Sequence, residues 1–134
     1  MVGAVAASGL LKFLFPANKL LGTTLPAGPA MQSFVLEIIL TAVLMFVILA
    51  VSSGAKERGI TAGIAIGAVV GLEAMFAGPI CGASMNPARS LAPALVSGHL
   101  EHLWIYMLAP MLGATLAVFG NVLVRGRSAM TAAP

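Results

Sequence analysis

Three long apolar runs dominate the pattern of hydrophobic and polar positions along the chain. Residues 31–51 contain a single charged residue, Glu37, and residues 60–77 and 103–124 are also almost entirely small or apolar. At 1.5 Å per residue, about twenty helical residues cross a hydrocarbon core of roughly 30 Å. The pattern therefore predicts three transmembrane helices over these ranges.

A shorter apolar run precedes them at residues 2–11, and it is followed by Lys12 and Pro16. Its roughly ten residues are too few to cross a bilayer. The run is therefore either the tail of a longer helix or a weak signal peptide. We favour the helix remnant, because no basic residue precedes the run.

The composition agrees with a membrane protein. Of the 134 residues, 60% are hydrophobic and 8% are charged, whereas about a quarter of a soluble domain is charged. The net charge of +3 comes from scattered bases, so we expect no nucleic-acid partner. One cysteine, Cys81, and two histidines, His99 and His102, are too few for a disulfide or a zinc centre, and we expect no metal and no cofactor.

The basic residues predict the orientation in the membrane. Four bases lie between the first two spans or after the third, namely Lys56, Arg58, Arg125 and Arg127. Only Lys12 and Lys19 lie on the other side. Because cytoplasmic loops carry an excess of Lys and Arg, the first group is predicted to be cytoplasmic. The stretch between the second and third spans then begins and ends outside.

That stretch, residues 78–98, reads GPICGASMNPARSLAPALVSG and is far less polar than an aqueous loop of this length. Its prolines and glycines break it repeatedly. We predict a re-entrant segment that dips into the bilayer and returns. Irregular backbone at membrane depth is tolerated only where it is buried in protein or lines a watery cavity.

The second part of this segment predicts a half-helix. Asn86 can cap a helix, Pro87 suits its first position, and residues 88–96 can continue it for roughly 15 Å. The positive end of this half-helix and the Asn86 amide would offer hydrogen bonds to a neutral solute and repel cations. Arg89 is costly in lipid and fits a water-lined constriction. The alternative, an exterior amphipathic helix, is disfavoured because these residues offer no solvated face.

The run Asn86-Pro87-Ala88-Arg89-Ser90 resembles the second NPA signature of the aquaporin and aquaglyceroporin family. The resemblance extends to Glu37 in the first span, the Gly-Pro before the dip and residues 110–114 in the last span, and it is nearest to the nodulin-26-like branch. It implies an all-α membrane protein with an aquaporin-like second inverted repeat. This repeat has three full transmembrane helices, one re-entrant half-helix and an N-terminal helix remnant.

Family members are six-span channels built from two inverted repeats, and members of this branch admit glycerol, neutral metalloid acids and, in some cases, water. The chain resembles only the second repeat, so the resemblance implies that an N-terminal half or further copies complete the pore. It also implies a tetramer in a plasma or inner membrane. A non-conducting fragment or accessory subunit is the alternative. An enzyme is not expected, because no nucleophile with an adjacent base is evident.

The resemblance places three of the four selectivity-filter positions at Ala74, Ala83 and Arg89. Alanine at the span position, where narrow water-selective relatives carry histidine, favours a wider aperture for polyols or metalloid acids. Glu37 resembles the buried glutamate that supports the re-entrant segment. Glu73 either edges the vestibule or supports the same segment through backbone N–H groups, and we favour support.

Two further patterns concern packing and the entry. Gly63, Gly67 and Gly71 recur every four residues and predict a helix face that a neighbouring helix can approach closely. Residues 13–28 contain Pro16 and Pro26 and predict an outer loop that folds over the entry to the pore.

Overall fold

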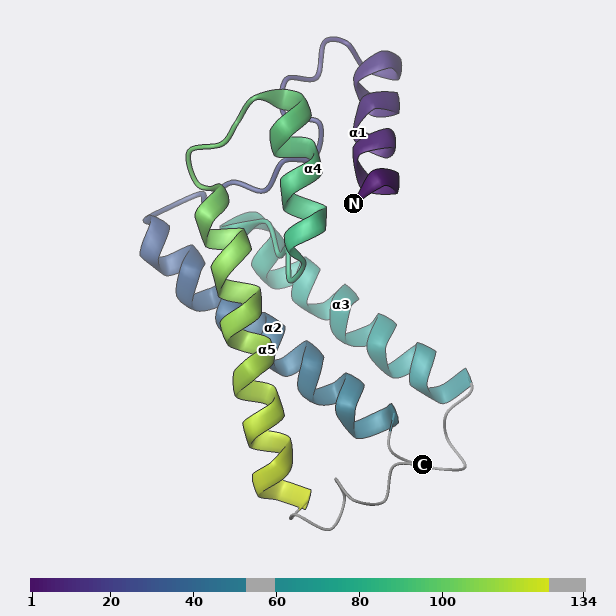
Figure 1. Ribbon diagram of the computed structural model, residues 1–134, viewed down its shortest axis with the longest axis vertical. Helices are drawn as coiled ribbons and strands as arrows, with labels where there is room; N and C mark the ends of the chain where they lie inside the picture. Colours follow the sequence, from purple (N-terminus) through teal and green to yellow (C-terminus); the bar gives the residue numbers. More distant parts are fainter. Residues whose placement is uncertain (53–59, 126–134) are drawn as a thin grey trace.

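The computed structural model describes residues 1–52 and 60–125 (Figure 1). Within these ranges the chain is all-helical and forms no strand. The helices are α1 (Val2–Leu14), α2 (Ala30–Ser52), α3 (Ile60–Cys81), α4 (Pro87–Ser97) and α5 (Leu103–Arg125). By length and composition α2, α3 and α5 can cross a membrane, which agrees with the three predicted spans. Lys56, Arg58 and Arg127, on which the predicted orientation rests, lie outside the described residues.

Two of the predicted boundaries differ from the structure by more than one residue. Helix α1 continues three residues beyond 11 and ends at Leu14. Helices usually end at or before the residue that precedes a proline, and Pro16 follows two residues later. Helix α3 continues to Cys81 rather than 77, so the irregular segment begins at Gly82 and not at 78. The proline at 79 lies in the last turn, where it removes only one intrahelical hydrogen bond, and Gly82 N–H still donates to the Gly78 carbonyl at 2.9 Å.

The most extensive helix contact among the described residues joins α2 and α5, which run in the same direction and cross (Figure 1). At the crossing, a Cβ on Gly113 would collide with the Ile38 carbonyl oxygen, and it would lie 2.9 Å from the Thr41 Cβ and 3.0 Å from the Ala42 nitrogen. Only glycine permits this backbone approach. Helix α3 packs on the other side of α2 and runs in the opposite direction (Figure 1).

The predicted glycine face of α3 makes no close helix contact among the described residues. A Cβ at Gly63, Gly67 or Gly71 would meet nothing within 4 Å among the described residues. The pattern correctly identifies a face of small residues, but within residues 1–52 and 60–125 no helix approaches it. The close approach is made instead by Gly113, a single glycine in an apolar run.

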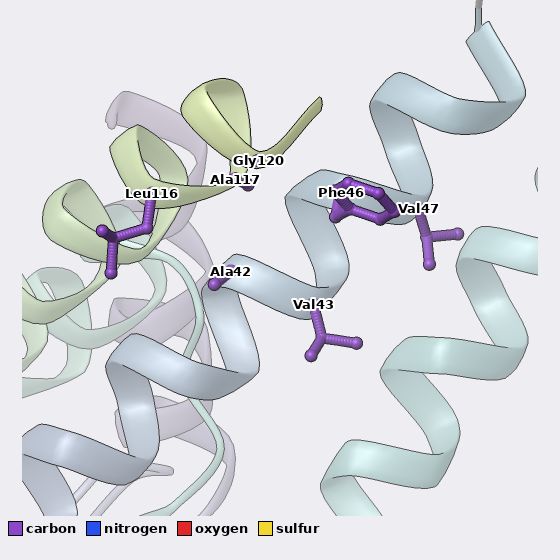
Figure 2. A pocket seen from close by; sticks show the side chains of 7 residues that line it. All are labelled: Ala42, Val43, Phe46, Val47, Leu116, Ala117 and Gly120. Carbon is purple, nitrogen blue, oxygen red and sulfur yellow. The ribbon is translucent and has the colours of Figure 1, made fainter. Parts of the chain in front are cut away.

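Beyond the crossing, α2 and α5 diverge and leave an apolar groove of about 300 Å³ (Figure 2). Its lining is Ala42, Val43, Phe46, Val47, Leu116, Ala117 and Gly120. None of these side chains has a polar group, so the groove offers no side-chain hydrogen bond to a hydroxylated solute.

The other end of the molecule holds the short helices. Helix α4 packs on α5, and α1 lies beside α4 (Figure 1). Below them, a small buried cluster joins α2, α3 and the irregular segment through Leu40, Ala77, Cys81 and Ala83. This cluster and the α4–α5 contact fix the position of the segment that carries the candidate site.

Candidate functional site

Residues 82–86 form a tight irregular turn between α3 and α4. Gly82, Ala83 and Met85 have φ angles of 86°, 41° and 53°. A non-glycine residue in this region costs about 1–3 kcal/mol and persists only where its surroundings hold it. The turn therefore needs strong anchoring from neighbouring elements.

Glu37 provides this anchor from α2. Its side chain is fully buried at 0% exposure. Oε1 accepts a hydrogen bond from the Ser84 N–H at 2.8 Å, and Oε2 accepts one from the Met85 N–H at 2.9 Å. Two N–H donors of the turn are thereby satisfied by one buried carboxylate. Glu37 holds the turn and does not line the cavity described below.

A second anchor comes from α5 and was not predicted. The buried hydroxyl of Tyr106 donates to the carbonyl of Cys81 at 2.7 Å. This bond satisfies the last carbonyl of α3, which has no partner within its own helix. A tyrosine near the start of an apolar span gives no sequence signal for such a bond, because an interfacial belt position explains it equally well.

Asn86 caps α4 as the sequence indicates. Its Oδ1 accepts from the N–H groups of Ala88 at 2.9 Å and Arg89 at 3.4 Å, and Pro87 occupies the first helical turn. Because Oδ1 is engaged, the side-chain NH₂ group is left to donate. The Asn86 side chain is exposed, so a solute can reach it.

The electrostatics of α4 are one-sided. The first turn contains no acidic residue that would offset the positive end of the helix dipole. At the other end, the Lys12 Nζ of α1 donates to the Val96 carbonyl at 3.2 Å. The N-terminus beside Asn86 and Arg89 is therefore the positive end that faces accessible space.

A cavity of about 430 Å³ lies along α4. Asn86, Ala88 and Arg89 line it together with Ala92 and Pro93. The opposite wall comes from α1 and the following loop, through Ala4, Ala7, Ser8, Leu11, Leu21 and Gly22. The sequence predicted the α4 side of this cavity but not the α1 side. The small residues at positions 4, 7 and 8 share one helix face, which is the signal that could have indicated it.

The structure does not bring the three predicted filter residues together in this cavity. Ala83 is buried at 5% exposure in the cluster with Cys81, and Ala74 is exposed on α3. Neither lines the cavity that contains Arg89. The assignment of Ala74 and Ala83 to a filter stays a prediction.

Glu73 does not make the hydrogen bonds that were one option for it. The N–H groups of Ser84 and Met85 go to Glu37. Glu73 is buried at 4% exposure, and its Oε2 is buried without a hydrogen-bond partner among the described residues. The N–H groups of Ser84 and Met85 therefore do not donate to Glu73, and support of the segment by Glu73 stays a prediction.

Comparison with known proteins places the chain in a family. Residues 1–120 match the family profile described as major intrinsic protein. The chain belongs to the major intrinsic protein family. Over 126 residues it is 45% identical to Aquaporin NIP1-1 of Zea mays and 46% identical to Nodulin-26 of Glycine max. Both alignments cover 93% of the chain.

These relatives place this major intrinsic protein in the aquaporin family, nodulin-26-like branch, as the sequence resemblance indicated. Members of the family are membrane channels for small solutes and not enzymes. The chain spans about half the length of the curated relatives it matches, 45% of the maize protein and 46% of the soybean protein.

Proposed function

We propose that this chain forms the second half of a passive channel for small uncharged solutes such as glycerol, neutral metalloid acids and water, and that the channel excludes ions and protons. The observation that carries the proposal is the N-terminus of α4. There the exposed Asn86 amide and Arg89 share one cavity at the positive end of a helix. Donors in a cavity that no carboxylate lines suit a solute that accepts hydrogen bonds and carries no charge.

The depth of this turn supports re-entry into the membrane. Helix α2 has 23 residues, so its midpoint is Thr41. Glu37 lies four residues earlier, which is about 6 Å along the helix axis. Because Glu37 binds the Ser84 and Met85 N–H groups, the turn lies alongside the interior of α2 and close to its middle. A polar station near mid-span is what a re-entrant half-helix requires.

Ion exclusion follows from the same groups. A cation at the α4 N-terminus meets the helix dipole and the Arg89 charge and finds no acidic residue in the first turn. The Asn86 NH₂ donates to the oxygen of a passing water molecule, so that oxygen points towards the helix. This orientation opposes a continuous proton chain through the site.

We assign the selection of solutes by size to the filter residues Ala74, Ala83 and Arg89, together with a fourth residue from the completing half. Alanine leaves space that a larger donor side chain would occupy, and this favours polyols and metalloid acids over water alone. The same proposal includes three further points. The pore is completed by an N-terminal half or by further copies, the protein assembles into tetramers, and it resides in a plasma or inner membrane.

Stopped-flow measurements on proteoliposomes test the proposal. The chain is reconstituted alone and together with the N-terminal half of the soybean relative, and glycerol, boric acid and water fluxes are compared with those of empty liposomes. We expect flux in at least one preparation. Asn86→Asp should reduce neutral-solute flux and admit cations, and Arg89→Ala should reduce discrimination between solutes. Thr115→Val is the matched control, because Thr115 is exposed on α5 and donates only within its own helix.

The second candidate function is a non-conducting accessory subunit. The observation that favours it is that Ala74 and Ala83 do not line the cavity that contains Arg89. A flux equal to that of empty liposomes in both preparations, with folded protein present, would support this candidate and contradict the channel proposal.

A further inference from the structure

Three buried hydroxyl groups connect the loop after α1 to the candidate site. Thr24 Oγ1 lies 2.6 Å from Ser90 Oγ, and Ser90 Oγ lies 2.5 Å from Ser84 Oγ. Their exposures are 4%, 1% and 3% for Thr24, Ser90 and Ser84. Thr24 is 66 positions away from Ser90 in the sequence, so this contact exists only because the loop folds back onto α4.

The direction of these hydrogen bonds is fixed by the last one. Ser84 Oγ donates to the Asn86 carbonyl at 2.9 Å. A hydroxyl has one proton, so Ser84 must accept from Ser90, and Ser90 must then accept from Thr24. The protons therefore all point the same way, from Thr24 through Ser90 and Ser84 to Asn86. We call this chain of four groups the hydroxyl relay.

The relay ends on the residue that caps α4. The Asn86 carbonyl accepts from Ser84 Oγ and also from the Ser90 N–H at 3.3 Å, so two donors fix its orientation. Aligned hydrogen bonds in a buried chain strengthen one another. The relay holds the backbone of Asn86, and the N–H groups of Ala88 and Arg89 hold its Oδ1, so together they set the direction of the side-chain amide.

Packing holds Thr24 in its place. A Cβ at Gly82 would lie 3.0 Å from both the Cβ and the Cγ2 of Thr24, so Thr24 fills the space beside that glycine. Nearby, the Ala27 N–H donates to the Ile80 carbonyl at 2.9 Å. The methyl group of Thr24 thus contacts the start of the turn, and its hydroxyl contacts the α4 helix.

We infer that Thr24 is a positioning residue for the site: its hydroxyl, acting through Ser90 and Ser84, orients Asn86 and so controls which solutes pass. The inference rests on the proposed channel function. It gives residues 15–29 a role in selectivity, where the sequence predicted only a loop over the entry.

Thr24→Val tests this role, because valine keeps the methyl group beside Gly82 and removes only the first donor of the relay. We expect the ratio of glycerol to water permeability to change by about fivefold, which corresponds to the loss of one ordinary hydrogen bond. Thr24→Ser restores the donor and should keep the original ratio. Thr23→Val is the matched control, since Thr23 bonds Ser97 and Leu20 and lies outside the relay.

Amide hydrogen exchange gives a second measurement that does not depend on conduction. Thr24→Val should accelerate exchange in residues 82–90 and leave residues 105–115 unchanged. Ser90→Ala breaks the same relay at its middle and should have the same effect, and the double variant should add little to either single one. This second variant keeps the test decisive where Thr24→Val folds poorly.

The outcomes separate this inference from the proposed function. A wild-type chain without flux in any preparation overturns the channel proposal, while the exchange measurement still tests the relay. A Thr24→Val protein that conducts with an unchanged permeability ratio overturns the role of Thr24, even where its stability is lower, because a merely structural residue would behave in that way.

Discussion

The α2–α5 crossing and the turn at residues 82–86 are held together by different physics. At the crossing, two apolar helices approach so closely that only glycine fits at position 113, and the contact is one of shape. At the turn, strained backbone is held by hydrogen bonds that the Glu37 carboxylate accepts and by one that the Tyr106 hydroxyl donates. Inside a membrane, shape gives rigidity without polar groups, whereas a polar station for solutes requires donors and acceptors that are individually satisfied.

This difference explains where the candidate site lies. The groove beside the crossing is of ample size but has only apolar side chains (Figure 2). The cavity along α4 contains Asn86 and Arg89. Substitutions at Glu37, Tyr106 and Gly113 test whether the turn depends on its hydrogen bonds and the crossing on its shape.

The largest effect is expected for Glu37→Ala. The substitution leaves two N–H groups, those of Ser84 and Met85, without their acceptor, at a cost of about 1–3 kcal/mol each. The free energy of unfolding, measured in mixed detergent micelles, should therefore fall by about 2–6 kcal/mol. Hydrogen exchange in residues 82–90 should accelerate. Glu37→Gln retains one acceptor and should lose less. A stability equal to wild type in both variants would contradict the anchoring role of Glu37.

A smaller effect is expected for Gly113→Ala at the crossing. The added methyl group meets the backbone of Ile38 and Ala42, which cannot move aside without separating the helices. Overpacking of this kind costs about 1–3 kcal/mol. Gly120→Ala on the same helix is the control, because its Cβ would lie 3.9 Å from the Phe46 ring, an ordinary contact. Equal stability of the two variants in the same micelle assay would show that the crossing tolerates separation.

Tyr106→Phe should have a more modest effect on the turn. It removes the donor to the buried Cys81 carbonyl and keeps the ring, so we expect the free energy of unfolding to fall by about 1–3 kcal/mol, the cost of one buried acceptor left unsatisfied. The loss should be accompanied by faster exchange at the end of α3. A change confined to α5 would instead assign Tyr106 to packing of that helix alone.

The same two regions differ in how far the sequence predicted them. The spans followed from apolar length, since about twenty apolar residues have few alternatives. The Asn86 cap and Pro87 followed from local rules that act within a few residues. The crossing did not, because the repeated glycines at 63, 67 and 71 gave a stronger pattern than the single Gly113, and a pattern does not show whether a neighbouring helix is present.

The turn was predicted only in part, for a related reason. Glu37 was assigned by family resemblance, and the residues alone did not distinguish its role from that of Glu73. The contact between Thr24 and Ser90 joins positions 66 residues apart, and it depends on the path of a loop that has no periodic pattern. The early end assigned to α3 reflects the Gly78-Pro79 pair, which marks a break in isolation but is accommodated within the last helical turn.

The smallest effect is expected for Lys12→Met, which tests the contact at the C-terminal end of α4 against the buried anchors of the turn at its N-terminal end. Lys12 donates to the Val96 carbonyl, but the contact is exposed, so water replaces the ammonium group when it is removed. We expect the unfolding temperature to fall by less than about 2 °C. Solute permeability should be unchanged, because the positive end of α4 beside Asn86 is untouched. A loss comparable to that of Glu37→Ala would mean that α4 is held from its C-terminal end, and that the buried anchors of the turn are not what positions it.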